Sequence, residues 1–155
     1  MSDLAKQLIA ENKRSRDTFL DLGKCGLTEV PAEVGKLIWL EGLSLANEWY
    51  EWDGRGWKLE YSQNTLDEHS PLANSGSFDL SPLAGLSGLQ TLILSDTLVA
   101  DLAPLAGLFA LQNLILAIAP VANLTPLAGL TALSALVVSS TQVTDLTPLA
   151  CSANA

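Results

Sequence analysis

The sequence predicts an α/β solenoid, a right-handed coil with short parallel strands on its concave face and short helical turns on its convex face. A 22-residue unit is repeated almost three times, beginning at Leu86, Leu108 and Leu130. A fixed period of this length is typical of stacked repeats. In the segment 92–94, Leu92 and Leu94 point to one side of the chain and Ile93 points to the other, as the two-residue period of a strand requires. One strand from each unit is therefore expected in a shared parallel sheet.

The second half of each unit predicts the convex face. The segments around Pro104, Pro126 and Pro148 have a proline that suits the first turn of a helix, and a glycine follows in the first two. They are too short to form stable helices on their own. We therefore expect tight turns or 3₁₀ segments, held in place by the leucines that stack between units.

The unit reads L-x-x-L-x-L-x-x-T-x-V-x-D-L-x-P-L-A-G-L, which resembles the leucine-rich repeats and, among them, the bacterial internalin-like type. The resemblance implies a bacterial protein with a leucine-rich repeat fold and a role in protein binding. It covers the repeat architecture, and the host-receptor role of surface-anchored internalins is not carried over.

Residues 1–17 are predicted to form a helical cap, because Leu4, Leu8 and Ile9 share one stripe of a helix from Asp3 to about Arg16. Such a cap would shield the edge of the first strand. Residues 18–47 then contain two coils of a 23-residue kind. Cys25, in the first of them, is expected to be a buried thiol about 25 Å from Cys151, too far for a disulfide.

The repeat pattern stops at residue 48. Residues 48–70 form an aromatic insertion, and turn residues 53–56 predict a β-hairpin followed by a polar return loop. The repeat spacing resumes at Leu72, so residues 71–150 are interpreted as internalin-like repeats and residues 151–155 as a tail. The whole chain is then expected to contain six coils, of which the third is degenerate. The aromatic residues Trp49, Trp52 and Trp57 are expected to cover the third coil. The alternative is a binding surface made of these residues and Tyr50.

Charge and composition exclude several classes of function. The net charge is −9, and all eight Lys and Arg residues fall at or before Lys58, which makes nucleic acid an improbable partner. The start lacks a signal-peptide pattern and no apolar run could span a bilayer, so we expect a cytoplasmic protein without membrane contact.

No motif predicts catalysis, a cofactor or a metal site. His69 is the single histidine, and no residues around it have metal-ligand spacing. Asp101 and Asp145 share one repeat position, with Asn123 between them, and are interpreted as turn formers. A phosphate-binding loop and a nucleophile elbow are both missing.

The remaining prediction is a non-catalytic module that binds a protein partner through the concave face and the aromatic insertion. The alternative is a remnant or fragment of a larger bacterial repeat protein, linked to a GTPase or sensor, with no partner of its own. The β-branched residues Ile93, Ile115 and Val137 on the concave face have a second explanation, because such residues are good strand formers whether or not they bind a partner. The concave positions are Thr91, Ile93, Ser95, Asn113, Ile115, Ala117, Val137 and Ser139.

The last coil is expected to leave apolar residues uncovered. We predict a homodimer through this C-terminal end, with fraying beyond about Val143 as the alternative. The residues concerned are Leu133, Leu136, Val138, Val143, Leu146 and Leu149.

Overall fold

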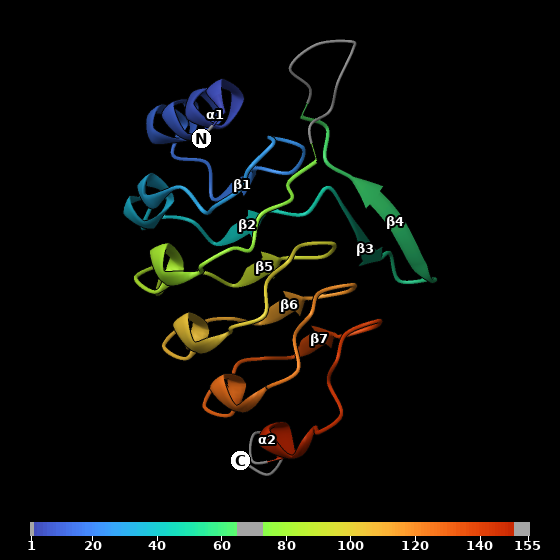
Figure 1. The fold of residues 1–155 in the computed structure, drawn as a ribbon. Helices are drawn as coiled ribbons and strands as arrows, with labels where there is room; N and C mark the ends of the chain where they lie inside the picture. The colour runs from blue at the N-terminus through green and yellow to red at the C-terminus, as the bar shows by residue number, and fades with distance from the viewer. Residues whose placement is uncertain (1, 65–72, 151–155) are drawn as a thin grey trace.

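A computed structural model describes residues 2–64 and 73–150, and its strands form the predicted curved ladder (Figure 1). In this part of the chain, five short parallel strands make one sheet in the order β1-β2-β5-β6-β7. The strands are β1 (Phe19–Asp21), β2 (Gly42–Ser44), β5 (Thr91–Ile93), β6 (Asn113–Ile115) and β7 (Ala135–Val137). The fold is the predicted leucine-rich repeat solenoid.

Leucines on the inner side of the strands fix the register of the sheet. Leu20 lies opposite Leu43, Leu43 opposite Leu92 and Leu92 opposite Leu114. All four side chains are buried in one continuous core. A shift of one residue would turn every one of these leucines toward solvent, so the buried ladder specifies one register.

Short 3₁₀ turns form the convex side, as the proline-containing segments predicted. They are η1 (Ala32–Lys36), η2 (Ser81–Leu83), η3 (Ala103–Leu105) and η4 (Thr125–Leu127), and the short helix α2 (Thr147–Ala150) follows in the last coil. Asp101 and Asp145 begin two of these segments by accepting 2.9 Å hydrogen bonds from the N–H groups of Ala103 and Thr147. Their interpretation as turn formers is confirmed.

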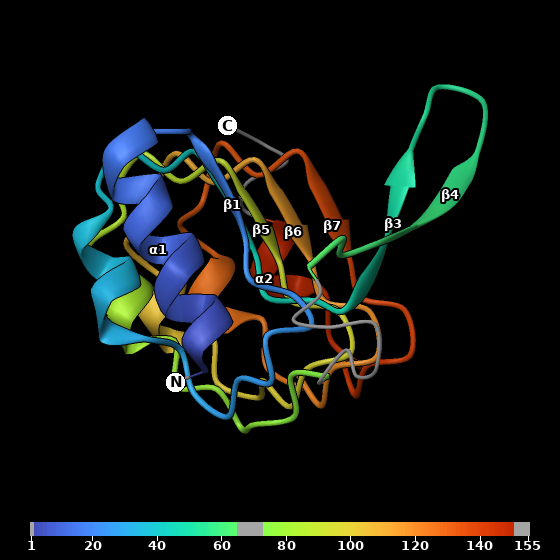
Figure 2. The same ribbon diagram turned by 90° about the horizontal axis from the view of Figure 1, so that it is seen from above.

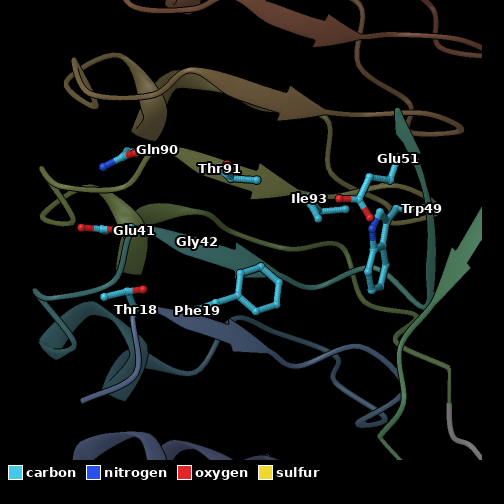
Figure 3. A pocket seen from close by; sticks show the side chains of 9 residues that line it. All are labelled: Thr18, Phe19, Glu41, Gly42, Trp49, Glu51, Gln90, Thr91 and Ile93. Atoms are coloured by element: carbon cyan, nitrogen blue, oxygen red, sulfur yellow. The ribbon is translucent and has the colours of Figure 1, made fainter. Parts of the chain in front are cut away.

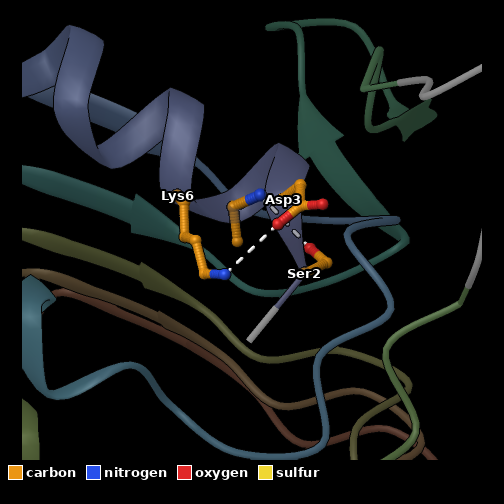
Figure 4. Close-up of polar contacts among 4 residues, drawn as sticks. Ser2, Asp3 and Lys6 are labelled. Atoms are coloured by element: carbon orange, nitrogen blue, oxygen red, sulfur yellow. Dashed lines mark hydrogen bonds and ion pairs between the residues drawn. The ribbon is translucent and has the colours of Figure 1, made fainter.

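Helix α1 (Asp3–Ser15) covers the first coil, as predicted. Its N-terminus is capped by Ser2, whose Oγ accepts a 3.2 Å hydrogen bond from the Ala5 N–H, and Asp3 forms an ion pair with Lys6 (Figure 4). Such caps satisfy N–H groups that the helix itself leaves unpaired.

A polar contact ties this helix to the second coil. Asn12 is 4% exposed, and its Oδ1 accepts a 3.0 Å hydrogen bond from the indole N–H of Trp39. The guanidinium of Arg16 lies 3.9 Å from the centre of a Trp39 ring. The cap is therefore held by directional contacts as well as by its apolar stripe.

The predicted third coil is wrong. Strand β2 pairs directly with β5, with Gly42 opposite Thr91, so the sheet has no strand between these two coils. Leu72, where that coil was predicted, lies outside the described residues. The physical reason is that the chain leaves the second coil after Asn47 and returns to the same coil at Asn74. The N–H of Asn74 donates a 3.0 Å hydrogen bond to Oδ1 of Asn47. The intervening residues are thus an insertion within the second coil.

The insertion begins with the predicted hairpin, formed by β3 (Glu48–Trp52) and β4 (Trp57–Tyr61). Asp53 Oδ1 accepts hydrogen bonds from the N–H groups of Arg55 and Gly56, and Gly54 supplies the positive φ of 89° that the turn needs. Figure 2 shows the hairpin on the side of the sheet away from α1, with its tip pointing away from the coil.

The last coil is less buried than the coil before it. Leu114 and Leu116 are fully buried, whereas Leu136 and Val138 are only partly buried and Leu146 is 59% exposed. Among residues 2–64 and 73–150, none of the helices has the length and apolar character needed to cross a membrane.

Candidate partner-binding groove

A groove of about 510 Å³ lies between the hairpin and the outward face of the first three strands of the sheet (Figure 3). This volume is within the range of about 300–1,000 Å³ that is typical of ligand sites. The groove is lined by Thr18, Phe19, Glu41, Gly42, Trp49, Glu51, Gln90, Thr91 and Ile93.

The floor is formed by Phe19 and Gly42, which are neighbours in the sheet register. The Phe19 ring lies against the Gly42 backbone so closely that a Cβ on Gly42 would come within 2.5 Å of its Cδ2 atom. Phe19 nevertheless remains 47% exposed. Any larger residue at position 42 would push this aromatic ring away from its place in the floor.

The opposite wall is formed by β3, where alternation places Trp49 and Glu51 on the face toward the sheet. Figure 3 shows the Trp49 indole beside Ile93 and the Glu51 side chain directed toward the same residue. Ile93 is only 5% exposed. The hairpin therefore covers one end of the apolar stripe that the sequence predicted on the concave face.

Long-range polar contacts hold the base of the hairpin in place. The Ser62 hydroxyl, which is buried, donates to Oδ2 of Asp21 at 2.8 Å, and Nδ2 of Asn64 donates to the carbonyls of Asp21 and Gly23 at 2.8 and 3.0 Å. Burial raises the pKa of the Asp21 carboxyl, although hydrogen bonds from the Gly23 N–H and the Ser62 hydroxyl act in the opposite direction. These contacts fix the angle at which the hairpin leaves the sheet.

A second, much smaller cavity of about 10 Å³ lies on the other side of Trp49. It is bounded by Leu59 of the hairpin and by Ser95, Ala117 and Ile118 of the coils. Ser95 Oγ is buried there without a hydrogen-bond partner among the described residues. Ile118 adopts a positive φ of 61°, which is a strained conformation for a β-branched residue.

The concave residues predicted from the sequence are divided between three environments. Thr91 and Ile93 line the groove, Ser95 and Ala117 are buried beside the small cavity, and Asn113, Ile115 and Val137 are half-buried on the open remainder of the face, with Ser139 exposed. Whether they bind a partner stays a prediction.

Of the predicted aromatic residues, Trp49 lies in the groove wall. It was expected to cover a third coil, and it lies instead against the outward face of the sheet. Tyr50, Trp52 and Trp57 belong to the hairpin strands, and their side chains are outside the described part of the structure.

Sequence reasoning missed Phe19, Gly42 and the two carboxylates of Glu41 and Glu51. Phe19 and Gly42 occupy the same register position as Thr91, and they directly precede the inward leucines of their strands. Extending the alternation of the later repeats into the first two coils would have identified both residues. The role of Glu51 depends on the position of the hairpin relative to the sheet, and the repeat pattern does not predict that position.

The described residues contain no group of three His, Cys, Asp or Glu side chains that could hold a metal ion. His69 and Cys151 lie outside the described residues.

Cys25 is a free, fully buried thiol, as predicted, and burial together with the nearby Asp21 charge raises its pKa to about 12. It is therefore protonated at neutral pH, as is typical of a buried structural thiol.

Neither a protein-family model nor a curated protein matches the chain. Among solved structures, it is similar to internalin C2 from Listeria monocytogenes, with 27% identity and a TM-score of 0.66 over 92% of this chain and 51% of that chain. The chain is an internalin-like leucine-rich repeat protein. An internalin (inlF) from the same organism shares the fold at 22% identity and a TM-score of 0.58, over 97% of this chain and 46% of that one. This internalin-like protein thus spans about half the length of each of the two structures.

Proposed function

We propose that this internalin-like protein is a non-catalytic protein-interaction module whose partner binds the concave face of the sheet. The groove between the hairpin and the first three strands is the observation that carries the proposal. Leucine-rich repeat folds of this kind generally serve interaction, which supports the same conclusion.

The concave face combines a recess with an open surface. The groove offers the recess, and the half-buried Asn113, Ile115 and Val137 continue the same face along β6 and β7. Because strand register and the buried leucine ladder fix the backbone, a partner would meet a preformed surface with little ordering cost. Tryptophan and tyrosine are common at the centres of such interfaces, which supports a contribution from the hairpin.

The alternative function is that of a structural remnant or a fragment of a larger bacterial repeat protein with no partner of its own. In that case the concave face would be dispensable. The cytoplasmic location and bacterial origin expected from the sequence stay predictions.

A second proposal concerns self-association through the last coil. Its support is the 59% exposure of Leu146 together with the partial exposure of Leu136 and Val138, which are apolar residues on one end of the solenoid. Such an apolar end lies beside β7, whose outer edge pairs with no strand among the described residues, and this favours association with a second copy.

Site-specific photo-crosslinking in the organism that encodes the chain tests the concave-face proposal. A photoreactive residue at Asn113, on the concave face, should give a discrete adduct with one other protein. The same residue at Thr125, exposed on the convex η4 turn, should not. Adding Ile115→Glu should abolish the Asn113 adduct while circular dichroism shows an intact fold. Equal adducts from both positions, or none from Asn113, would contradict the proposal.

A further inference from the structure

We propose that the groove between Phe19 and Trp49 binds a positively charged side chain, arginine or lysine, from an extended basic segment of the partner. This inference rests on the proposed function and names the chemistry of the partner at that same face. Three observations support it: the groove is lined by aromatic rings and carboxylates, these carboxylates form no ion pair among the described residues, and other aromatic rings of the chain contact a cation.

The groove combines aromatic rings with carboxylates. Phe19 and Trp49 stand on its two sides, and the exposed Glu41 and Glu51 also line it (Figure 3). None of its nine lining residues is basic. Aromatic faces attract cations, and carboxylates accept charge-assisted hydrogen bonds from guanidinium and ammonium groups. A basic side chain would satisfy both kinds of group at once.

Neither carboxylate of the groove forms an ion pair within the described part of the chain. Lys58 lies opposite Glu51 in the hairpin register, but its Nζ forms its ion pair with Glu60 at 2.5 Å, and the charge of Glu51 acts on Lys58 only from beyond ion-pair distance. The other ion pair among residues 2–64 and 73–150 joins Lys6 to Asp3 on the first helix. Glu41 and Glu51 therefore remain available to a cation supplied from outside.

Elsewhere the chain places its own cations on aromatic rings. Arg16 lies 3.9 Å from the centre of a Trp39 ring, and the Lys24 ammonium lies 5.4 Å from the Tyr61 ring. Among the described residues, neither Phe19 nor Trp49 receives such a cation. The groove thus presents the same kind of surface without an internal occupant.

Other ligand chemistries fit less well. An anionic segment would meet the carboxylates of Glu41 and Glu51 in a chain that carries a net charge of −9. A purely aliphatic segment would cover these carboxylates without pairing them, which is costly. The negative field of the whole molecule would also speed the approach of a basic partner.

Fluorescence anisotropy with labelled peptides tests the proposal on the full chain. The probe is a peptide of alternating glycine and arginine, and the control replaces each arginine with citrulline, which keeps the shape and removes the charge. We expect the arginine peptide to bind, less tightly as salt is raised, and the citrulline peptide to bind at least about tenfold more weakly. Equal binding of both peptides, or binding of neither, would overturn the proposal.

Matched charge-removing variants locate the site. Glu51→Gln should weaken binding of the arginine peptide by roughly threefold to fivefold, as expected for an exposed charge pair. Glu11→Gln makes the same charge change on the exposed side of α1 and should leave binding within about twofold of the parent. If Glu11→Gln weakens binding as much as Glu51→Gln does, the attraction is non-specific and the groove is not the site.

The two proposals fail in distinguishable ways. If the peptide results fail while the Asn113 photo-adduct persists, the basic segment is wrong and concave-face binding stands. If the photo-adduct is also missing, both proposals are overturned.

Discussion

The N–H of Asn74 donates a hydrogen bond to the side-chain oxygen of Asn47 at 3.0 Å, joining the two ends of the insertion. Asn74 is 3% exposed, and its Nδ2 also donates to the carbonyls of Leu22 and Leu45 at 2.8 Å each. Its Oδ1 accepts from the N–H of Leu27. One side chain thus satisfies three backbone groups from the first two coils.

Replacing Asn74 with Ala should therefore destabilise the protein by about 2–5 kcal/mol, because it leaves three buried backbone groups without a partner. Urea denaturation followed by circular dichroism measures the loss. The control is Asn123→Ala, at an exposed turn where the side chain accepts one hydrogen bond from the Thr125 N–H, and it should cost less. Equal losses in the two variants would show that the three buried hydrogen bonds of the Asn74 side chain contribute no more to stability than the single exposed turn bond of Asn123.

Trp39→Phe should cost about 1–3 kcal/mol, because it removes the indole N–H and leaves the buried Oδ1 of Asn12 unpaired. Thermal and urea unfolding both report this loss. Phe109→Ala changes an aromatic residue that is 64% exposed and should stay close to the parent. A stable Trp39→Phe variant would mean that the hydrogen bond between Trp39 and Asn12 does not help to hold α1.

Ile118→Asn is expected to stabilise the fold by about 0.5–1 kcal/mol. The positive φ of 61° is unfavourable for isoleucine, whereas asparagine adopts it readily. Ser140→Asn tests the equivalent position one coil later, at φ 55°, where no β-branch is removed, so the gain should be smaller. A destabilised Ile118→Asn variant would indicate that the contact beside Leu59 outweighs the backbone strain.

Asp21→Asn should change how stability depends on pH. The pKa of Asp21 is raised by burial, so the folded state holds this proton more tightly than the unfolded state does. This contribution to stability is present below the usual carboxyl value of about 3.8 and is lost as pH rises above it. The free energy of unfolding of the variant, relative to the parent, should therefore improve between acidic and neutral pH. A constant difference across that range would contradict this assignment.

Light scattering at micromolar concentration tests association of residues 1–155 through the last coil. The parent should be larger than a monomer, and Leu146→Glu should shift it toward the monomer by placing charge on the apolar end. Ile38→Glu makes the same change at a side chain that is 70% exposed beside η1 and should have no effect. Monomers in all three preparations would rule the association out.

The repeat architecture could be predicted because its information is local and periodic. Leu92 and Leu114 recur at one spacing, and each recurrence places a leucine in the same buried ladder. The hairpin was also predictable, since Asp53 and Gly54 carry the chemistry of its turn.

The location of the hairpin was not predictable in the same way. It depends on contacts such as Ser62 with Asp21, which join residues far apart in the sequence through polar groups that follow no period. Counting repeat spacing across the insertion then produced a third coil at Leu72 that the sheet does not contain. The groove was missed for the same reason, because Glu51 and Phe19 come together only once the hairpin is placed.

The junction of Asn47 with Asn74 makes residues 48–73 an exchangeable cassette. Both ends meet within a single coil, so the leucine ladder is complete on either side of the cassette. Loop-closure entropy rises only slowly with length, by about 0.6 kcal/mol for each doubling, so cassettes of quite different size would be tolerated. Grafting another hairpin between these two asparagines would replace one wall of the groove and leave the floor at Phe19 and Gly42 untouched, which makes this coil a natural position for engineering new recognition.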